Sequence, residues 1–203
     1  MSSVAHDDPG GAGAACAAAS LWLWRHPRPE DAVGRCIGRT DLAIDARRAK
    51  RLAHRIERIA RRERLPREVW TSPLRRCADV GRALARRGYA HRIDERLLEL
   101  DFGAWDGLPW SAIGPEAFAP WDADFLHHGP GGGETVAALR ARVASFAAEV
   151  AGRPVIVVAH AGWVNALRLA AHPAPTPADW PRPVPYGAGL VIPNPCRSRP
   201  CPR

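Results

Sequence analysis

The stretch PVIVVAHAGWVNALRLA, residues 154–170, decides the fold class that we predict for this 203-residue chain. Its first six residues, 154–159, form an unbroken apolar run, which is typical of a strand covered on both faces. His160 follows at once, and the residues after it, to about Ala171, predict a helix. A buried strand that leads directly into a helix is typical of a parallel sheet with helices on both of its faces.

The rest of the chain alternates between strand and helix patterns. We predict helices where apolar residues recur every three or four positions, and strands where short apolar runs stop abruptly. Ser72 is the expected N-cap of one helix, with Pro73 at its first position. The alternation predicts one α/β domain over residues 20–192, a three-layer αβα sandwich with a mainly parallel central sheet. The predicted strands are residues 20–24, 68–71, 90–93, 154–159 and 186–192, and the predicted helices before the last are residues 45–64, 72–88 and 134–150.

Both ends of the chain differ in composition from this domain. Residues 1–19 are rich in Gly and Ala and residues 193–203 in Pro and Arg, so we expect a disordered extension and a flexible tail. The N-terminal segment lacks the basic start and hydrophobic run of a secretory signal, which predicts a cytoplasmic protein. No run of about 18 apolar residues predicts a membrane span. Five cysteines without a C-x-x-C pair give no zinc-binding or redox motif.

The chain is basic, with a formal net charge of +8 from 29 basic and 21 acidic residues, and 28 of the basic residues are Arg. This excess of positive charge is compatible with an anionic partner but does not identify it. The arginines of residues 47–64 lie opposite the apolar stripe of a predicted helix, with no interleaved aromatic residues that would stack on bases. We interpret them as a solvated helix face. No nucleic-acid partner is expected, and a nucleic-acid-binding protein is kept as a remote alternative.

Polar side chains follow three of the predicted strands. Ligands bind beyond the carboxyl ends of the strands in open parallel sheets. Two of the helices that start there also offer free backbone N–H groups and a positive dipole end, which suit an anion. The placement predicts a site of the size of a phosphate group. The residues are Arg25 and His26 after the first strand, Ser72, Arg75 and Arg76 after the second, and His160 after the strand 154–159.

Several motifs around these positions occur together and in order. They are Arg25-His26, TSPLRR (residues 71–76), LLELDFGAWDG (97–107), GGE (132–134) and VVAHAG (157–162). As a set they resemble the histidine phosphatase superfamily, which contains cofactor-dependent phosphoglycerate mutases, acid phosphatases and alpha-ribazole phosphatases. The stretch GRCIGRTDL (34–42) is most similar to the alpha-ribazole phosphatase branch. The resemblance covers about residues 20–172.

The resemblance implies a role for each matched residue. His26 would attack phosphorus and become a phosphohistidine. Arg25, Arg76 and His160 would balance the charge on the transferred phosphoryl group, and Glu99 would protonate the leaving oxygen and then activate water. It implies no metal or other cofactor, because arginines neutralise the charge. The expected substrate-binding residues are Arg39, Ala161 and Gly162.

The sequence departs from the family pattern at three positions. Pro27 follows the expected nucleophile where the family usually has Gly, and proline has no N–H and a fixed φ. Ala161 replaces a common Gly, and Asn165 stands where an Arg often sits. None of these changes removes a charge-bearing or proton-transferring group, so we expect an active variant.

The expected function is that of a metal-independent phosphomonoester hydrolase acting on a small phosphorylated substrate, with alpha-ribazole 5'-phosphate of cobalamin biosynthesis as the specific candidate. The alternatives are a phosphoglycerate mutase-like enzyme and a catalytically weak phosphate-ester-binding homologue. The loop of residues 108–133 is shorter than the mutase insertion, which favours a phosphatase. We expect this loop and residues 28–40 to select the substrate, while the oligomeric state stays open.

Overall fold

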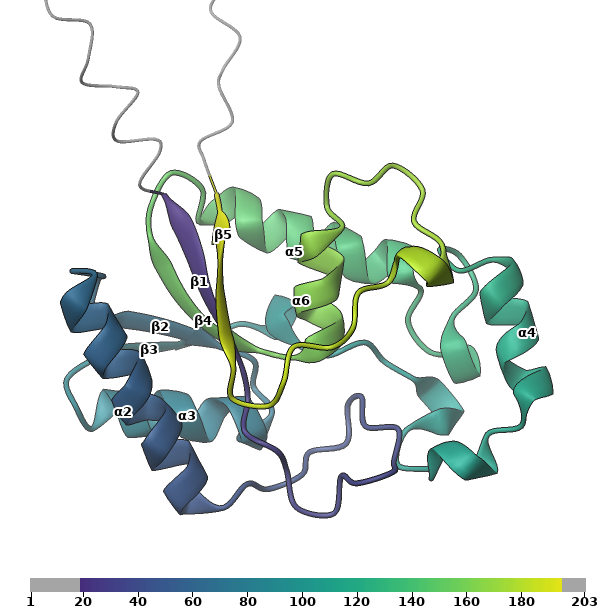
Figure 1. Cartoon of the computed structure of the whole chain (residues 1–203), viewed down its shortest axis with the longest axis horizontal. Helices are drawn as coiled ribbons and strands as arrows, with labels where there is room; N and C mark the ends of the chain where they lie inside the picture. Colours follow the sequence, from purple (N-terminus) through teal and green to yellow (C-terminus); the bar gives the residue numbers. More distant parts are fainter. Residues whose placement is uncertain (1–18, 195–203) are drawn as a thin grey trace, which may run out of the picture.

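The computed structural model describes residues 19–194. Five strands form one sheet: β1 (Ser20–Arg25), β2 (Glu68–Thr71), β3 (Ala90–Ile93), β4 (Val155–Ala159) and β5 (Gly189–Pro193). Their order is β3-β2-β4-β1-β5 (Figure 1). All neighbouring strands are parallel except β5, which pairs antiparallel with β1 at the edge. Of the expected extension and tail, residues 1–18 and 195–203 lie outside the described residues.

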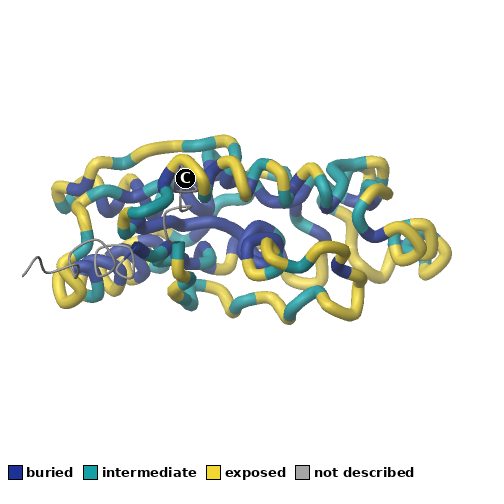
Figure 2. Tube along the Cα trace, turned by 90° about the horizontal axis from the view of Figure 1, so that it is seen from above, coloured by how far each residue is buried: buried dark blue, intermediate teal, exposed yellow. Residues whose placement is uncertain are grey.

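Helices cover both faces of the sheet, so the predicted α/β sandwich is confirmed. The helices α2 (Ala46–Arg62) and α3 (Arg75–Ala85) pack on one face, and α5 (Val136–Glu149) and α6 (Ala161–Arg168) pack on the other. Figure 2 shows the buried interior between more exposed outer segments. Among the described residues, no helix is both long and apolar enough to cross a membrane.

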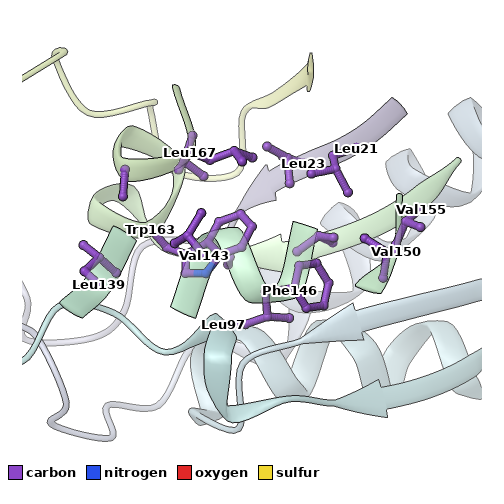
Figure 3. Packing of buried hydrophobic residues seen from close by; sticks show 14 of the residues in the cluster. Leu21, Leu23, Leu97, Leu139, Val143, Phe146, Val150, Val155, Trp163 and Leu167 are labelled. Atoms are coloured by element: carbon purple, nitrogen blue, oxygen red, sulfur yellow. The ribbon is translucent and has the colours of Figure 1, made fainter. Parts of the chain in front are cut away.

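The central strand β4 is buried at every position. Its odd-numbered residues face the cluster that α5 and α6 complete, and its even-numbered residues face the cluster of α2 and α3. Figure 3 shows Phe146 of α5 and Trp163 of α6 packed together in the first of these clusters. Full burial of such a side chain stabilises the fold by about 1.5–3 kcal/mol. The packing on both faces fixes the position of His160, the residue that follows β4.

Two helices begin later than the sequence predicts. The helix expected from Ser72 begins at Arg75, because Leu74 is still extended, and the Ser72 hydroxyl accepts a hydrogen bond from the Leu74 amide at 3.3 Å. The helix expected from Glu134 begins at Val136, and the Thr135 hydroxyl caps it by accepting from the Ala138 amide at 3.1 Å. In both cases side-chain hydrogen bonds hold the preceding residues outside the helix.

The segment of residues 108–133 forms an extension beyond the end of the sheet, with α4 (Pro115–Ala123) at its outer side (Figure 1). Aromatic side chains hold it together: the ring centroids of Trp105 and Phe118 are 4.8 Å apart, and those of Trp121 and Phe125 are 5.5 Å apart. The extension therefore has its own small apolar cluster.

Candidate active site

The carboxyl ends of β1 and β4 bring two histidines together. The strands are parallel neighbours, and their register places Arg25 opposite Ala159. His26 and His160 are the next residues along each strand, and their ring centroids lie 5.0 Å apart with 60° between the ring planes. Both side chains are buried. The structure thus places these two predicted site residues in contact at the edge where parallel sheets bind ligands.

His26 is held in one tautomer by the backbone. Its Nδ1 lies 2.7 Å from the Pro27 carbonyl oxygen, and Nδ1 carries the proton because a carbonyl only accepts. Nε2 therefore keeps its lone pair. Burial lowers the pKa of His26 well below the ordinary value of 6.5, and the charges of Arg76 and Arg25 lower it further. The ring is therefore neutral at neutral pH, and the Pro27 carbonyl, which proline retains, accepts its Nδ1 proton.

Arg76, in the first turn of α3, is buried with 1% exposure. Its guanidinium donates to the Thr40 carbonyl at 2.7 Å, to the Gly38 carbonyl at 2.5 Å and to His160 Nδ1 at 3.3 Å. Among residues 19–194 it forms no ion pair with a carboxylate. A buried charge without a counter-charge is costly, so this guanidinium favours an anion beside it.

His160 accepts the Arg76 hydrogen bond at Nδ1, so this nitrogen is unprotonated and the neutral ring carries its proton on Nε2. Burial is the main cause that lowers the pKa of His160 well below 6.5, and the charge of Arg76 lowers it further. The Cys77 Sγ lies 3.4 Å from Nε2. The ring is therefore positioned by α3, from both Arg76 and Cys77.

Asp106 holds the loop that orients Arg76. Its carboxylate accepts hydrogen bonds from the amides of Gly38, Arg39 and Thr40 at 2.8, 2.8 and 2.7 Å. These three amides turn toward Asp106, while the carbonyls of the same loop accept from Arg76. Sequence reasoning did not single out Asp106, because an acidic residue before a glycine is also common in exposed turns.

Glu99 sits at the N-terminus of α6. Its Oε2 accepts from the Gly162 amide at 3.1 Å, and its Oε1 accepts from the Trp163 amide at 3.2 Å and the Leu100 amide at 3.0 Å. The Gly162 amide, expected to bind substrate, is therefore engaged by Glu99. The Ala161 amide, by contrast, has no acceptor among the described residues. A free N–H at a helix N-terminus suits an anionic oxygen.

Two arginines fix the backbone of Glu99. Arg142 donates to its carbonyl at 3.0 Å and Arg39 donates to the same oxygen at 3.1 Å. Glu134 bonds to Arg142 at 2.7 and 2.8 Å, and its carboxylate lies 3.5 Å from Arg39. Arg39 thus helps to position the backbone of Glu99, the expected acid. Direct contact of Arg39 with the substrate stays a prediction. Arg142 was not expected from the sequence.

Arg25 lies against Tyr186, which the sequence placed in the last predicted strand and not in the site, whereas β5 begins only at Gly189. The guanidinium carbon is 3.7 Å from the centroid of the Tyr186 ring, and Nη1 donates to the Val184 carbonyl at 2.8 Å. The tyrosine ring also lies 5.5 Å from the ring of His26. The Arg25 Nε is buried and has no partner among the described residues. The guanidinium thus keeps hydrogen-bonding capacity next to the two histidines.

A cavity of about 270 Å³ opens beside Glu99 and Arg25. Both expected selectivity segments contribute to it, residues 28–40 through Arg35 and Ile37, and residues 108–133 through tryptophans. The connection from α6 to β5 also contributes, which the sequence did not predict. The aromatic residues that line the cavity are Phe102, Trp110, Trp121, Trp180 and Tyr186.

Asn165 is a polar residue that lines this largely aromatic cavity. Its Nδ2 donates to the Pro181 carbonyl at 2.7 Å, which fixes the orientation of the amide. The Oδ1 is buried and has no partner among residues 19–194. A buried acceptor without a donor costs about 1–3 kcal/mol, so a ligand that brings a hydroxyl or N–H would relieve it.

One further residue from the sequence analysis, Arg75, is not part of the group around the two histidines. Arg75 is exposed, and its amide donates to the Asp41 carboxylate at 2.6 Å. Consecutive arginines in the first turn of α3 therefore point in different directions, and only Arg76 reaches His160.

A parallel αβα sheet whose carboxyl edge holds two buried histidines and a buried arginine without an acidic partner defines a class of α/β proteins suited to bind phosphate esters. The histidine phosphatase superfamily (branch 1) matches residues 21–192. The chain belongs to this superfamily and is a phosphatase.

Curated relatives and solved structures agree with this assignment. The chain is 31% identical over 170 residues to the glucosyl-3-phosphoglycerate phosphatase of Mycobacterium tuberculosis (strain ATCC 25618 / H37Rv), covering 71% of this chain and 75% of the relative. It is 31% identical over 177 residues to the protein of that name from Mycolicibacterium vanbaalenii, covering 79% and 77%.

Among solved structures, the native mycobacterial glucosyl-3-phosphoglycerate phosphatase superposes with a TM-score of 0.69 at 28% identity, covering 85% of this chain and 89% of that one. The alpha-ribazole phosphatase from Shigella flexneri has the same TM-score of 0.69 at 24% identity, covering 85% and 90%. The second likeness shows the fold alone.

Proposed function

We propose that this phosphatase hydrolyses phosphate monoesters through a phosphohistidine on His26, without a metal ion. The observation that carries the proposal is the buried guanidinium of Arg76, which has no acidic partner among the described residues and lies beside two buried, neutral histidines. An anionic phosphoryl group supplies the missing counter-charge. The free lone pair of His26 Nε2 supplies the nucleophile.

The reaction would proceed in two displacements. In the first, His26 Nε2 forms a bond to phosphorus while the bond to the leaving oxygen breaks, and Glu99 gives that oxygen a proton. In the second, Glu99 takes a proton from water, the water oxygen bonds to phosphorus, and the P–N bond breaks to release inorganic phosphate. Arg25, Arg76 and His160 would stabilise the charge on the phosphoryl oxygens in both steps.

The arginines are the reason to propose metal independence, because they supply the positive charge that a divalent cation supplies in other phosphatases. Within residues 19–194, no three His, Cys, Asp or Glu side chains gather in an arrangement that would hold a metal ion.

For the substrate, we propose an ester whose leaving alcohol carries both a ring and a hydrogen-bond donor. Tryptophans line the cavity next to Glu99, and the unpartnered Oδ1 of Asn165 requires a donor. Arg35 lines the same cavity and pairs with no carboxylate among the described residues, which suits an acidic group on the ligand. Glucosyl-3-phosphoglycerate has a sugar ring, hydroxyls and a carboxylate, and the 31% identical relatives carry its name.

A second substrate candidate is alpha-ribazole 5'-phosphate. It is favoured by the sequence similarity of residues 34–42 to that branch and by the aromatic walls of the cavity. It offers a flat ring system and hydroxyls but no carboxylate for Arg35. The two candidates therefore differ in the charge of the leaving group.

The test measures phosphate release from p-nitrophenyl phosphate in EDTA by the wild type and by His26→Ala. We expect activity in EDTA, and its loss in the variant with the circular dichroism spectrum preserved. Full activity of His26→Ala, or activity that requires added metal, would overturn the mechanism. Binding of orthovanadate without turnover of any ester would instead indicate a weak phosphate-ester-binding homologue.

A comparison of kcat/KM for glucosyl-3-phosphoglycerate and alpha-ribazole 5'-phosphate then decides between the substrates. An Arg35→Gln variant should lower kcat/KM for glucosyl-3-phosphoglycerate more than kcat/KM for alpha-ribazole 5'-phosphate. Formation of 2-phosphoglycerate from 3-phosphoglycerate would support the mutase-like alternative.

A further inference from the structure

A groove of about 590 Å³ shares Tyr186 as a lining residue with the substrate cavity. Four arginines line it, one from the loop after β1 and three from α2. We call it the arginine groove and define it by Arg28, Arg48, Arg51 and Arg55. We propose that the arginine groove is a second anion-binding site, which takes a small oligophosphate independently of the phosphoryl group at His26.

The cations of the arginine groove form no close ion pairs with acidic residues in the part of the chain that the structure describes. Among residues 19–194, none of the four forms an ion pair with a carboxylate, although other arginines of the same helix do: Arg61 pairs with Glu57 at 2.7 Å and Arg62 with Glu63 at 2.7 Å. Arg48, Arg51 and Arg55 lie three and four positions apart, so they share one face of α2 and repel one another. A polyanion in the groove would relieve this repulsion.

The backbone ties the arginine groove to the catalytic centre. Pro27, which directly follows the nucleophile, lines the groove together with Gly187. The Gly187 amide donates to the Arg25 carbonyl at 3.0 Å and to the His26 carbonyl at 3.1 Å. Tyr186 lines both the groove and the cavity and carries the Arg25 guanidinium on its ring. A ligand in the groove therefore contacts residues adjacent to the nucleophile without reaching its buried ring.

The size and chemistry of the groove favour a small oligophosphate. A guanidinium group can donate two parallel hydrogen bonds to the oxygens of one phosphate group. Several guanidinium groups on one helix face therefore match a chain of linked phosphate groups better than a single phosphate. The groove is about twice as large as the cavity, at 590 against 270 Å³, and widely open. Single-stranded nucleic acid would need a row of stacking aromatics, and among the described residues that line the groove only Tyr186 is aromatic.

The proposal is tested by calorimetric titration of the full chain with tripolyphosphate, in the presence of saturating orthovanadate to occupy the centre at His26. We expect the wild type to bind tripolyphosphate and the double variant Arg51→Gln/Arg55→Gln to bind at least about tenfold more weakly, because charge-assisted hydrogen bonds are lost. The matched control is Arg47→Gln/Arg58→Gln, which removes the same charge from exposed positions of α2 outside the groove and should keep the wild-type affinity. Thermal unfolding shows that each variant is folded.

Equal weakening in both double variants, or no binding by the wild type, would overturn the proposal, and so would binding that occurs only when orthovanadate is left out. A single-stranded oligonucleotide that binds more tightly than tripolyphosphate, and loses this binding only in the Arg51→Gln/Arg55→Gln variant, would identify the ligand of the groove as nucleic acid. That result would also overturn the proposal. The same titration with His26→Ala separates this proposal from the proposed catalysis. Binding should persist there even if the variant, or the wild type, has no phosphatase activity.

Discussion

The Glu99 carboxylate occupies the N-terminus of α6, where its Oε2 accepts a hydrogen bond of 3.1 Å from the Gly162 amide. The contact is possible because residue 162 is a glycine: a Cβ there would lie 2.5 Å from Glu99 Oε1. The proposed acid is thus oriented by the helix that follows His160.

Replacing Gly162 by Ala should displace the Glu99 carboxylate. We expect kcat for an alkyl phosphate, whose leaving oxygen needs a proton, to fall by about 100-fold, as expected when a general acid is lost. Hydrolysis of p-nitrophenyl phosphate should fall much less, because p-nitrophenolate leaves without one. Steady-state kinetics on both esters check this. An Ala166→Gly variant, elsewhere on α6, is the control, and an equal loss on both esters would contradict the prediction.

Removing the acceptor that holds the loop of residues 38–40 should loosen Arg76. Asp106→Asn leaves one oxygen for three amides, so at least one buried N–H loses its partner. We expect the free energy of unfolding to fall by about 2 kcal/mol, with a rise in KM as Arg76 loses its orientation. Urea unfolding measures the first effect. Asp122→Asn, at an exposed position of α4, should change neither quantity.

The stability of the protein should depend on phosphate through Arg76. At a phosphate concentration of 100 times its Kd, the wild type should gain about 2.7 kcal/mol of unfolding free energy. Arg76→Met, which removes the buried guanidinium, should gain almost nothing, and Arg75→Met, at the exposed neighbouring position, should respond like the wild type. Thermal unfolding with and without phosphate measures the shift. The same response in both variants would show that Arg76 does not bind the anion.

Acid should destabilise the protein through its two buried histidines. The folded-state pKa of His26 and of His160 lies well below 6.5, mainly because of burial. Their contribution is therefore complete above pH 6.5 and is lost as the pH falls toward the folded-state values, because the unfolded chain binds the protons more readily. The unfolding free energy should fall by up to about 1.4 kcal/mol per pH unit for each histidine.

Urea unfolding between pH 7.5 and 4.5 measures this dependence. His160→Gln should have a shallower slope, while a substitution of the exposed His54 should keep the wild-type slope. The acid limb of kcat/KM, where His26 becomes protonated, should likewise lie below pH 6.5.

Asn165 should select the leaving group. In Asn165→Leu the buried acceptor is gone, so kcat/KM for a hydroxyl-bearing ring ester should fall by about tenfold, the effect of one lost hydrogen bond to a buried group. The value for p-nitrophenyl phosphate, which has no donor to offer, should change little. A parallel loss on both esters would mean that Asn165 supports the cavity only through its bond to the Pro181 carbonyl.

Local sequence patterns predicted most of the elements that position the site. β2 and β3 have the predicted bounds, and β4 differs by one residue, because short apolar runs with abrupt ends mark strands clearly. The predicted starts of α3 and α5 were wrong, because the Ser72 hydroxyl bonds to the Leu74 amide, which is still outside α3, and Thr135 caps α5. The connection from α6 to β5 has no periodic pattern, so its contribution to the cavity through Trp180 and Tyr186 could not be predicted.

By itself, the sequence determined that the chain alternates strands and helices and that Arg25, His26, Arg76 and His160 stand at or shortly after strand ends, because these features depend on neighbours along the chain. Only the tertiary structure decided that Arg76 has no acidic partner among the described residues, that Asp106 holds its loop, and that Gly162 holds Glu99. The Asp106 and Gly162 contacts join positions 68 and 63 residues apart. Such contacts depend on strand order, register and the path of each loop, which no local pattern contains.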